Sequence, residues 1–199
     1  MKQLFTVILL VGLVTVSAAA DTSEVRYFEA NLSSSAEVPH VTDRRAVGTA
    51  VIAMYLNRND VGGITSAVVD FLIEYYLGQD EELIAMHIHR AATGSNGPIV
   101  ISSGGLDFGT PSVTAMAGEG RLFFQRIATT DSTALEAIEG VIANPAAYYV
   151  NVHSTSRRPG LFRGQLRNTE ITTLTALRDA VDAIGRQLDR LLRRSGLIP

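Results

Sequence analysis

The sequence predicts an all-β fold: a Greek-key β-sandwich or barrel of about eight strands with one short inserted helix and a C-terminal amphipathic helix. Apolar and polar residues alternate with a period of two in several segments, as they do in half-buried strands. Gly, Pro, Asn and Asp cluster between these segments, which is typical of the turns in sandwiches and barrels. The inserted helix is predicted over residues 131–145.

Eight segments have strand character, and turn-forming residues bound them. The segment 64–77 is the clearest of them. Val69 and Phe71 fall on one of its faces, and Asp70 falls on the other. Residues 57–63, NRNDVGG, predict the hairpin turn that precedes it. The predicted strands are 25–32, 46–56, 64–77, 82–92, 97–104, 119–127, 147–154 and 160–167.

One helical pattern interrupts the predicted strands. In DSTALEAIEGVIANP, Thr133 and Glu136 have the spacing of a capping box. Asn144 and Pro145 end the pattern, since proline cannot continue a helix. Residues 104–118, rich in Gly, Ser, Thr and Ala, are predicted as a loop.

The N-terminus differs in character from the predicted sheet. Residues 1–20 combine a basic start, a short apolar run and small residues up to Ala20. This is the layout of a secretory signal peptide cleaved near Ala20. It predicts a secreted or periplasmic protein whose β-sandwich domain covers residues 21–168.

Residues 169–199 predict an amphipathic helix. Apolar residues keep a/d spacing over about three heptads, and arginines gather near its end. Three roles are open to this helix: packing on its own domain, self-association as a short coiled coil in a homo-oligomer, or contact with a membrane surface. The apolar positions are Leu174, Leu177, Val181, Ile184, Leu188 and Leu191.

Composition narrows the function classes. The formal net charge of −3 gives no electrostatic case for nucleic-acid binding. The chain contains no cysteine, which excludes disulfides, thiol chemistry and cysteine metal ligands. The motifs of serine hydrolases, phosphate-binding loops and HExxH metalloenzymes are also missing. These observations favour a binding protein and leave enzymatic activity open.

Two of the four histidines lie in one short motif, AMHIHRAA. Residues two apart in a strand point to the same side, so His87 and His89 share a face. Met86 and Ile88 point the other way, toward the natural core side. The two histidines are therefore expected on the outward, solvated face. The later strand YYVNVHS repeats the arrangement and contributes His153.

Three imidazoles can converge on one ion if these two strands are neighbours. Neutral imidazole is the commonest protein ligand of copper and zinc, so His87, His89 and His153 are candidate ligands of one such ion. The alternative is that each exposed histidine only hydrogen-bonds a loop carbonyl. His40, in AEVPHVTD, is either a fourth ligand or incidental. Asn151 is a candidate to orient an imidazole from behind.

Three segments, in order, resemble the CHRD domain, a module named for chordin and widespread in secreted bacterial proteins. They are FEANLSSSAEVPHVTDRRAVGTAVIAMYL, AMHIHRAATGSNGPIV and AAYYVNVHSTSRRPGLFRGQL, and the likeness spans about residues 26–167. The resemblance implies an extracellular β-sandwich module whose partner is an unknown extracellular protein or a metal ion. Glu37 fits the family pattern but is otherwise expected to be an exposed carboxylate.

The chain is also distantly similar to copper/zinc superoxide dismutases. Those enzymes carry an HxH strand, a later histidine and an arginine near a C-terminal Gly-rich strand. The matching positions are His87, His89, His153 and Arg163. No other histidine matches the bridging ligand or the zinc ligands. This similarity makes a mononuclear copper enzyme acting on superoxide an alternative to a binding module. A purely structural, oligomerising protein is a third possibility. Arg163 has a simpler role open to it, namely pairing with a carboxylate or capping a loop carbonyl.

Overall fold

The computed structural model describes residues 22–103 and 113–169, so the predicted signal peptide and C-terminal helix lie outside the described residues. Within them, the strands form one antiparallel sheet, which confirms the predicted all-β class. The strands are β1 Thr22–Ser33, β2 Ala46–Arg58, β3 Ile64–Leu77, β4 Glu81–Arg90, β5 Ile99–Ser102, β6 Val113–Ala115, β7 Gly118–Thr129, β8 Tyr148–Ser154, β9 Phe162–Gln165 and β10 Arg167–Asn168. The helices are α1 Ser132–Ala143 and the short 3₁₀ helices η1 Ser34–Ala36 and η2 Pro145–Ala147.

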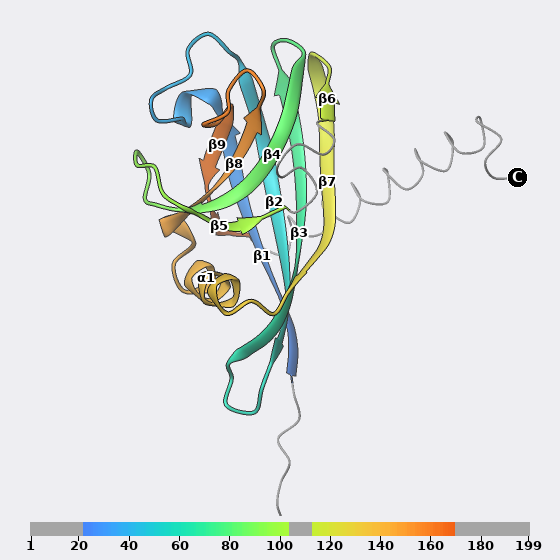
Figure 1. The fold of residues 1–199 in the computed structure, drawn as a ribbon, viewed down its shortest axis with the longest axis vertical. Helices are drawn as coiled ribbons and strands as arrows, with labels where there is room; N and C mark the ends of the chain where they lie inside the picture. The colour runs from blue at the N-terminus through green and yellow to red at the C-terminus, as the bar shows by residue number, and fades with distance from the viewer. Residues whose placement is uncertain (1–21, 104–112, 170–199) are drawn as a thin grey trace, which may run out of the picture.

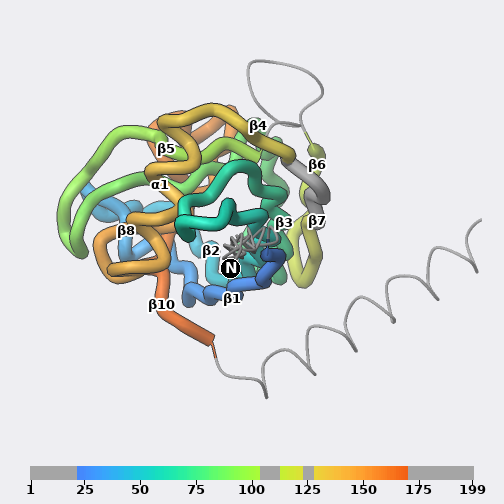
Figure 2. Tube along the Cα trace, turned by 90° about the horizontal axis from the view of Figure 1, so that it is seen from below, coloured from blue at the N-terminus to red at the C-terminus, as the bar shows by residue number. Residues whose placement is uncertain are grey.

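The sheet curls on itself into a half-barrel. Its strand order is β5-β4-β8-β9-β1-β2-β3-β7, so four strands separate β3 from β4. In a flat sheet these two strands would lie about 24 Å apart, at about 4.8 Å per strand. The connection through residues 78–80 reaches only about 14 Å when fully extended. The two halves of the sheet must therefore face each other, and Figures 1 and 2 show the strands curling around a common interior.

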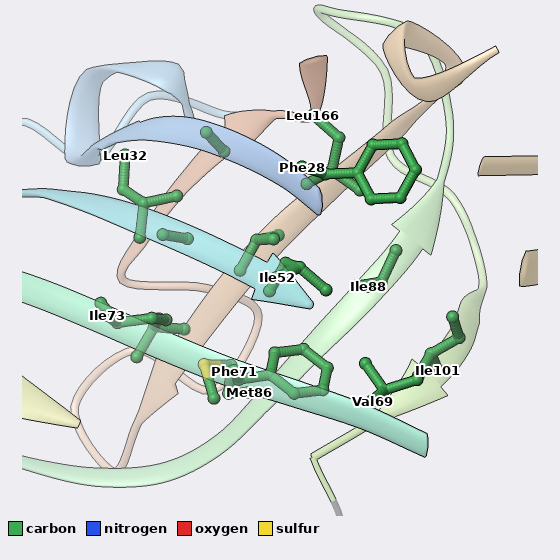
Figure 3. Packing of buried hydrophobic residues seen from close by; sticks show 14 of the residues in the cluster. Phe28, Leu32, Ile52, Val69, Phe71, Ile73, Met86, Ile88, Ile101 and Leu166 are labelled. Carbon is green, nitrogen blue, oxygen red and sulfur yellow. The ribbon is translucent and has the colours of Figure 1, made fainter. Parts of the chain in front are cut away.

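Apolar side chains from both halves fill the interior. Phe28, Ile52 and Phe71, from β1, β2 and β3, are at most 1% exposed. Met86 and Ile88 of β4 are fully buried as well, and they approach from the opposite half in Figure 3. The two-residue period of each strand sends its alternate side chains to this interior. The remaining side chains, including the histidines of β4, lie on the outer face.

Helix α1 packs against β3 and β5 (Figure 1). Ala137, Ile138 and Val141 are its buried residues, and their spacing places them on one side of the helix. Among the residues that the structure describes, no helix has the length and apolar character needed to cross a bilayer.

Two local predictions were wrong. The segment predicted as a loop contains β6, which pairs with the start of β4; three residues are too few for a periodic signal. The helix cap is Asp131, whose side chain accepts a hydrogen bond from the backbone N–H of Ala134. Thr133 therefore lies inside the first turn, because the acidic residue two positions earlier is the one with extended backbone.

Candidate metal centre

Strands β4 and β8 are neighbours, as the proposed convergence of the histidines requires. The antiparallel register pairs His87 with Asn151, and Ala85 with His153. His87 and His153 are therefore diagonal neighbours on the outer face. His89 lies two residues further along β4, on the same face as His87. Because Ala85 has only a methyl group, it leaves room beside the His153 ring.

The three imidazoles form a compact group. The Nδ1 atom of His87 lies 3.0 Å from the Nε2 atom of His153. One nitrogen from each ring can be chosen so that all three lie within 4.8 Å of one another, and the group could hold a metal ion. An ion bonded to each nitrogen at about 2.0 Å needs them roughly 3.3 Å apart. Ring rotations that move the nitrogens by about 1 Å would therefore bring the three imidazoles to a coordinating geometry.

Two backbone carbonyls orient two of the rings. The Nδ1 atom of His89 lies 3.0 Å from the carbonyl oxygen of Gly97, and that of His153 lies 2.8 Å from the carbonyl oxygen of Arg158. A carbonyl oxygen only accepts, so each Nδ1 carries the proton and each Nε2 presents a lone pair. This is how histidine ligands of metal ions are commonly held, with one nitrogen donating to a carbonyl while the other binds.

The histidines lie on the outer face as predicted, but the prediction that this face is solvated was wrong. His87, His89 and His153 are only 6%, 7% and 6% exposed. Loops cover them, since the carbonyls that hold His89 and His153 belong to residues 91–98 and 155–161. This burial lowers the pKa of His89, because the charged imidazolium is poorly solvated there. His89 is therefore kept in the neutral form that binds metals.

An aromatic ring and an arginine pack behind His89. The ring of Tyr149 stacks on His89 with centroids 4.9 Å apart, and the Arg163 guanidinium lies 4.6 Å from the centroid of Tyr149. Arg163 also donates to the carbonyl of Ala36 at 2.7 Å and to Oδ1 of Asn96 at 2.8 Å. The simpler role predicted for Arg163, capping a loop carbonyl, is confirmed. Its two hydrogen bonds attach the segments that contain Ala36 and Asn96 to β9.

The other predicted residues have mixed outcomes. The Asn151 amide donates to the carbonyl of Pro159 at 3.4 Å, so it contacts the covering loop. Glu37 was expected to be exposed but is 4% exposed, because the segment after η1 folds over Asn151. His40 is exposed and lies on an open groove beside Tyr76, outside the three-histidine group. A role for His40 as fourth ligand is therefore wrong for this arrangement.

The family model of the CHRD domain matches residues 28–166 of the chain. The chain belongs to the CHRD-domain family. The matched range contains all three histidines, Asn151 and Arg163, which confirms the resemblance read from the ordered motifs. No curated protein and no solved structure matches the chain.

Sequence reasoning missed how the CHRD domain covers its histidines. Tyr149 and Asn96 carried no signal beyond their residue types, and the backbone carbonyls of Gly97 and Arg158 carried none at all. One sign was available: YYVNVHS contains no charged residue, and every residue of β8 is buried. Strands buried on both faces read as nearly continuous runs, and this one could have indicated a covered outer face.

Proposed function

We propose that this CHRD-domain protein is an exported binding module that holds one transition-metal ion, copper or zinc, through His87, His89 and His153. The observation that carries the proposal is the convergence of three buried imidazoles, two of which donate through Nδ1 to backbone carbonyls and so have an unprotonated Nε2. Export rests on the signal-peptide layout of residues 1–20.

The state of the His89 ring argues for a ligand rather than for simple packing. Its Nε2 atom is buried and has no hydrogen-bond partner. A buried acceptor without a donor destabilises a fold by about 1–3 kcal/mol. A metal ion satisfies this lone pair, and the neutral state of the ring suits the ion. Metal binding also has to replace the hydrogen bond between His87 and His153. Binding is expected to weaken in acid, because an imidazole has to be unprotonated to bind a metal ion.

The donor set favours copper or zinc over harder ions. Three imidazole nitrogens without a carboxylate or thiolate suit these two metals, whereas calcium, magnesium and manganese prefer oxygen ligands. Three protein ligands also leave one position of a four-coordinate ion for a small molecule. The donor types alone do not choose between copper and zinc.

An equilibrium titration tests the proposal. Wild-type protein is expected to bind one copper or zinc ion per chain, and a His87→Ala/His89→Ala/His153→Ala variant to lose more than about 100-fold in affinity, since even changes behind the ligands cost 10- to 100-fold. His40→Ala is the matched control, because it removes the exposed histidine outside the group. Circular dichroism checks that each variant is folded. Equal weak binding by wild type and the triple variant would remove the metal site.

A second candidate function is a mononuclear copper enzyme acting on superoxide. The observation that favours it is the buried Arg163, which packs through the Tyr149 ring against the three-nitrogen group, the combination expected from the resemblance to superoxide dismutases. Superoxide turnover by the copper-loaded protein is the test. A rate no faster than that of free copper ion excludes this function and leaves the binding module.

A further inference from the structure

Glu37 is a buried acid to which the proposed metal site assigns no role. Its side chain is 4% exposed, and its Oε1 atom is buried without a hydrogen-bond partner. Burial raises the pKa of Glu37 to about 7, although the Arg163 charge and the Asn151 amide act in the opposite direction. Buried acids of this kind cluster at functional sites.

The surrounding structure holds Glu37 in place from both sides. The carbonyl of Ala36, just before it, accepts from Nε of Arg163 at 2.7 Å. The carbonyl of Val38, just after it, accepts from Nδ2 of Asn96 at 2.8 Å. The N–H of Glu37 itself donates to the carbonyl of Ser34 at 3.2 Å. Three hydrogen bonds over three residues fix this backbone, so the inward direction of the side chain is built into the fold.

Gly160 makes room for the carboxyl group. A Cβ atom at this position would lie 2.6 Å and 2.7 Å from the two carboxylate oxygens of Glu37, and 2.6 Å from Nδ2 of Asn151. Real Cβ atoms essentially never come so close to another heavy atom. The positive φ of Gly160, 154°, also disfavours any other residue. The Glu37 carboxyl and the Asn151 amide therefore meet above this glycine.

These groups adjoin the histidines. Asn151 is the cross-strand partner of His87, and directly opposed side chains lie about 5 Å apart at Cβ. Gly160 lies two residues after Arg158, whose carbonyl holds His153. Glu37 thus touches residues that are next to two of the three rings.

Three buried atoms in this region lack a partner: Oε1 of Glu37, Oδ1 of Asn151 and Nε2 of His89. All three atoms are hydrogen-bond acceptors. The Asn151 amide nitrogen donates to the carbonyl of Pro159, and Nδ1 of His89 donates to the carbonyl of Gly97, so the remaining atom of each group can only accept. Unpaired buried acceptors call for donors or a cation, and here the described residues offer none to them. An ion satisfies the nitrogen; the two oxygens still need donors.

We propose that Glu37 and Asn151 form an oxygen-lined subsite beside the three histidines, which binds a small neutral molecule carrying hydrogen-bond donors, such as water, in the remaining position of the ion. This inference rests on the proposed function. The subsite also sets selectivity, because a carboxylate and an amide oxygen repel small anions that have no proton to donate. The Arg163 guanidinium, whose Nε lies 3.9 Å from Oε2 of Glu37, offsets part of this charge, but its N–H groups donate to Ala36 and Asn96 and so point away from the subsite.

Azide binding to the copper(II)-loaded protein tests the subsite. Azide is an anion without a donor proton, and its copper complex is followed by visible absorption. Glu37→Gln keeps the shape of the side chain but removes its charge, so the variant is expected to bind azide about tenfold more tightly than wild type at pH 8. At pH 6 the difference is expected to shrink, because the buried wild-type carboxyl, whose pKa is raised by burial, holds its proton to a greater extent than at pH 8. Glu74→Gln, at a half-exposed carboxylate of β3, is the control and should behave as wild type.

A second variant tests the opposite sign. Asn151→Asp adds a negative charge at the same subsite, and it is expected to weaken azide binding at pH 8. If Glu37→Gln fails to retain copper, the azide affinity of Asn151→Asp alone tests the subsite.

Equal azide affinities in wild type and Glu37→Gln at both pH values overturn the subsite, as does an unchanged affinity in Asn151→Asp. The absence of azide binding to any copper-loaded variant overturns it too, because no open position then exists. A wild-type protein that binds no copper contradicts the proposed function itself, a result that is distinct from copper bound with unchanged azide affinity.

Discussion

Gly160 is the position where the smallest chemical change is expected to disturb the candidate site most. In Gly160→Ala, the added methyl group meets the Glu37 carboxylate and the Asn151 amide at 2.6–2.7 Å. Together with the positive φ, this is expected to destabilise the protein by about 1–3 kcal/mol. It should also weaken metal binding, because the loop that holds His153 has to move.

Chemical denaturation of the metal-free protein and a metal titration check this prediction. Gly94→Ala is the control, since its φ is also positive but nothing lies within 4 Å of its Cβ position. Equal losses in the two variants would mean that backbone strain alone acts, without crowding at Glu37.

Glu37 is expected to make stability depend on pH. Its pKa rises from an ordinary 4.5 to about 7 on folding, so the folded state holds the proton more tightly than the unfolded chain. The free energy of unfolding should therefore fall as pH rises from about 4.5 to 7, by about 3 kcal/mol at most. In Glu37→Gln, which has no proton to lose, this fall should be absent.

Urea unfolding of the two metal-free proteins between pH 4.5 and 8 is the measurement. The comparison uses the change with pH and not the absolute difference, because other groups titrate equally in both proteins. Parallel curves over this range would show that the Glu37 carboxyl has an ordinary pKa.

At the scale of elements, the helix cap gives a direct test of α1. Asp131→Ala removes the side chain that accepts from the N–H of Ala134, and it is expected to destabilise the protein by about 1 kcal/mol. Thr133→Ala is the control, since Thr133 is exposed inside the first turn. Thermal or denaturant unfolding distinguishes the two. A larger loss in Thr133→Ala would favour the capping box read from the sequence instead.

The strands were predictable where alternation is long, and not where it is short. Ile64–Leu77 was predicted at its observed bounds, because its apolar residues face a core and its polar residues face out. Val113–Ala115 was missed, since three residues cannot show a period. The convergence of the histidines was predicted only on the condition that β4 and β8 are neighbours, because no local sequence pattern indicates which strands pair. It depends on the curl of the whole sheet.

At the scale of the whole molecule, every described strand and all three candidate ligands precede the predicted tail. A chain ending at Asn168 keeps β1 to β10 and all three histidines. It is therefore expected to bind one metal ion with an affinity within about twofold of the full chain. Loss of metal binding on truncation would contradict the site. Size measurement on both chains tests self-association, one of the three roles open to residues 169–199, and an unchanged oligomeric state removes that role.

The candidate ligands could be predicted from the sequence, but their surroundings could not. The HxH spacing and the later YYVNVHS strand placed His87, His89 and His153 on outer faces, and the structure brings them together. Their burial escaped prediction, as did that of Glu37, because the covering loops come from three distant parts of the chain. Periodicity reports which face of a strand a residue occupies, and the uncharged composition of YYVNVHS was the one local sign of a cover above that face.

X-ray absorption by the metal-loaded protein is the sharpest test of the three-histidine site, since it reports the atoms bound to the ion. Three imidazole nitrogens are expected at about 2.0 Å from copper or zinc, with the multiple scattering that imidazole rings produce. A first shell made mainly of oxygen, with one imidazole or none, would contradict the three-histidine site.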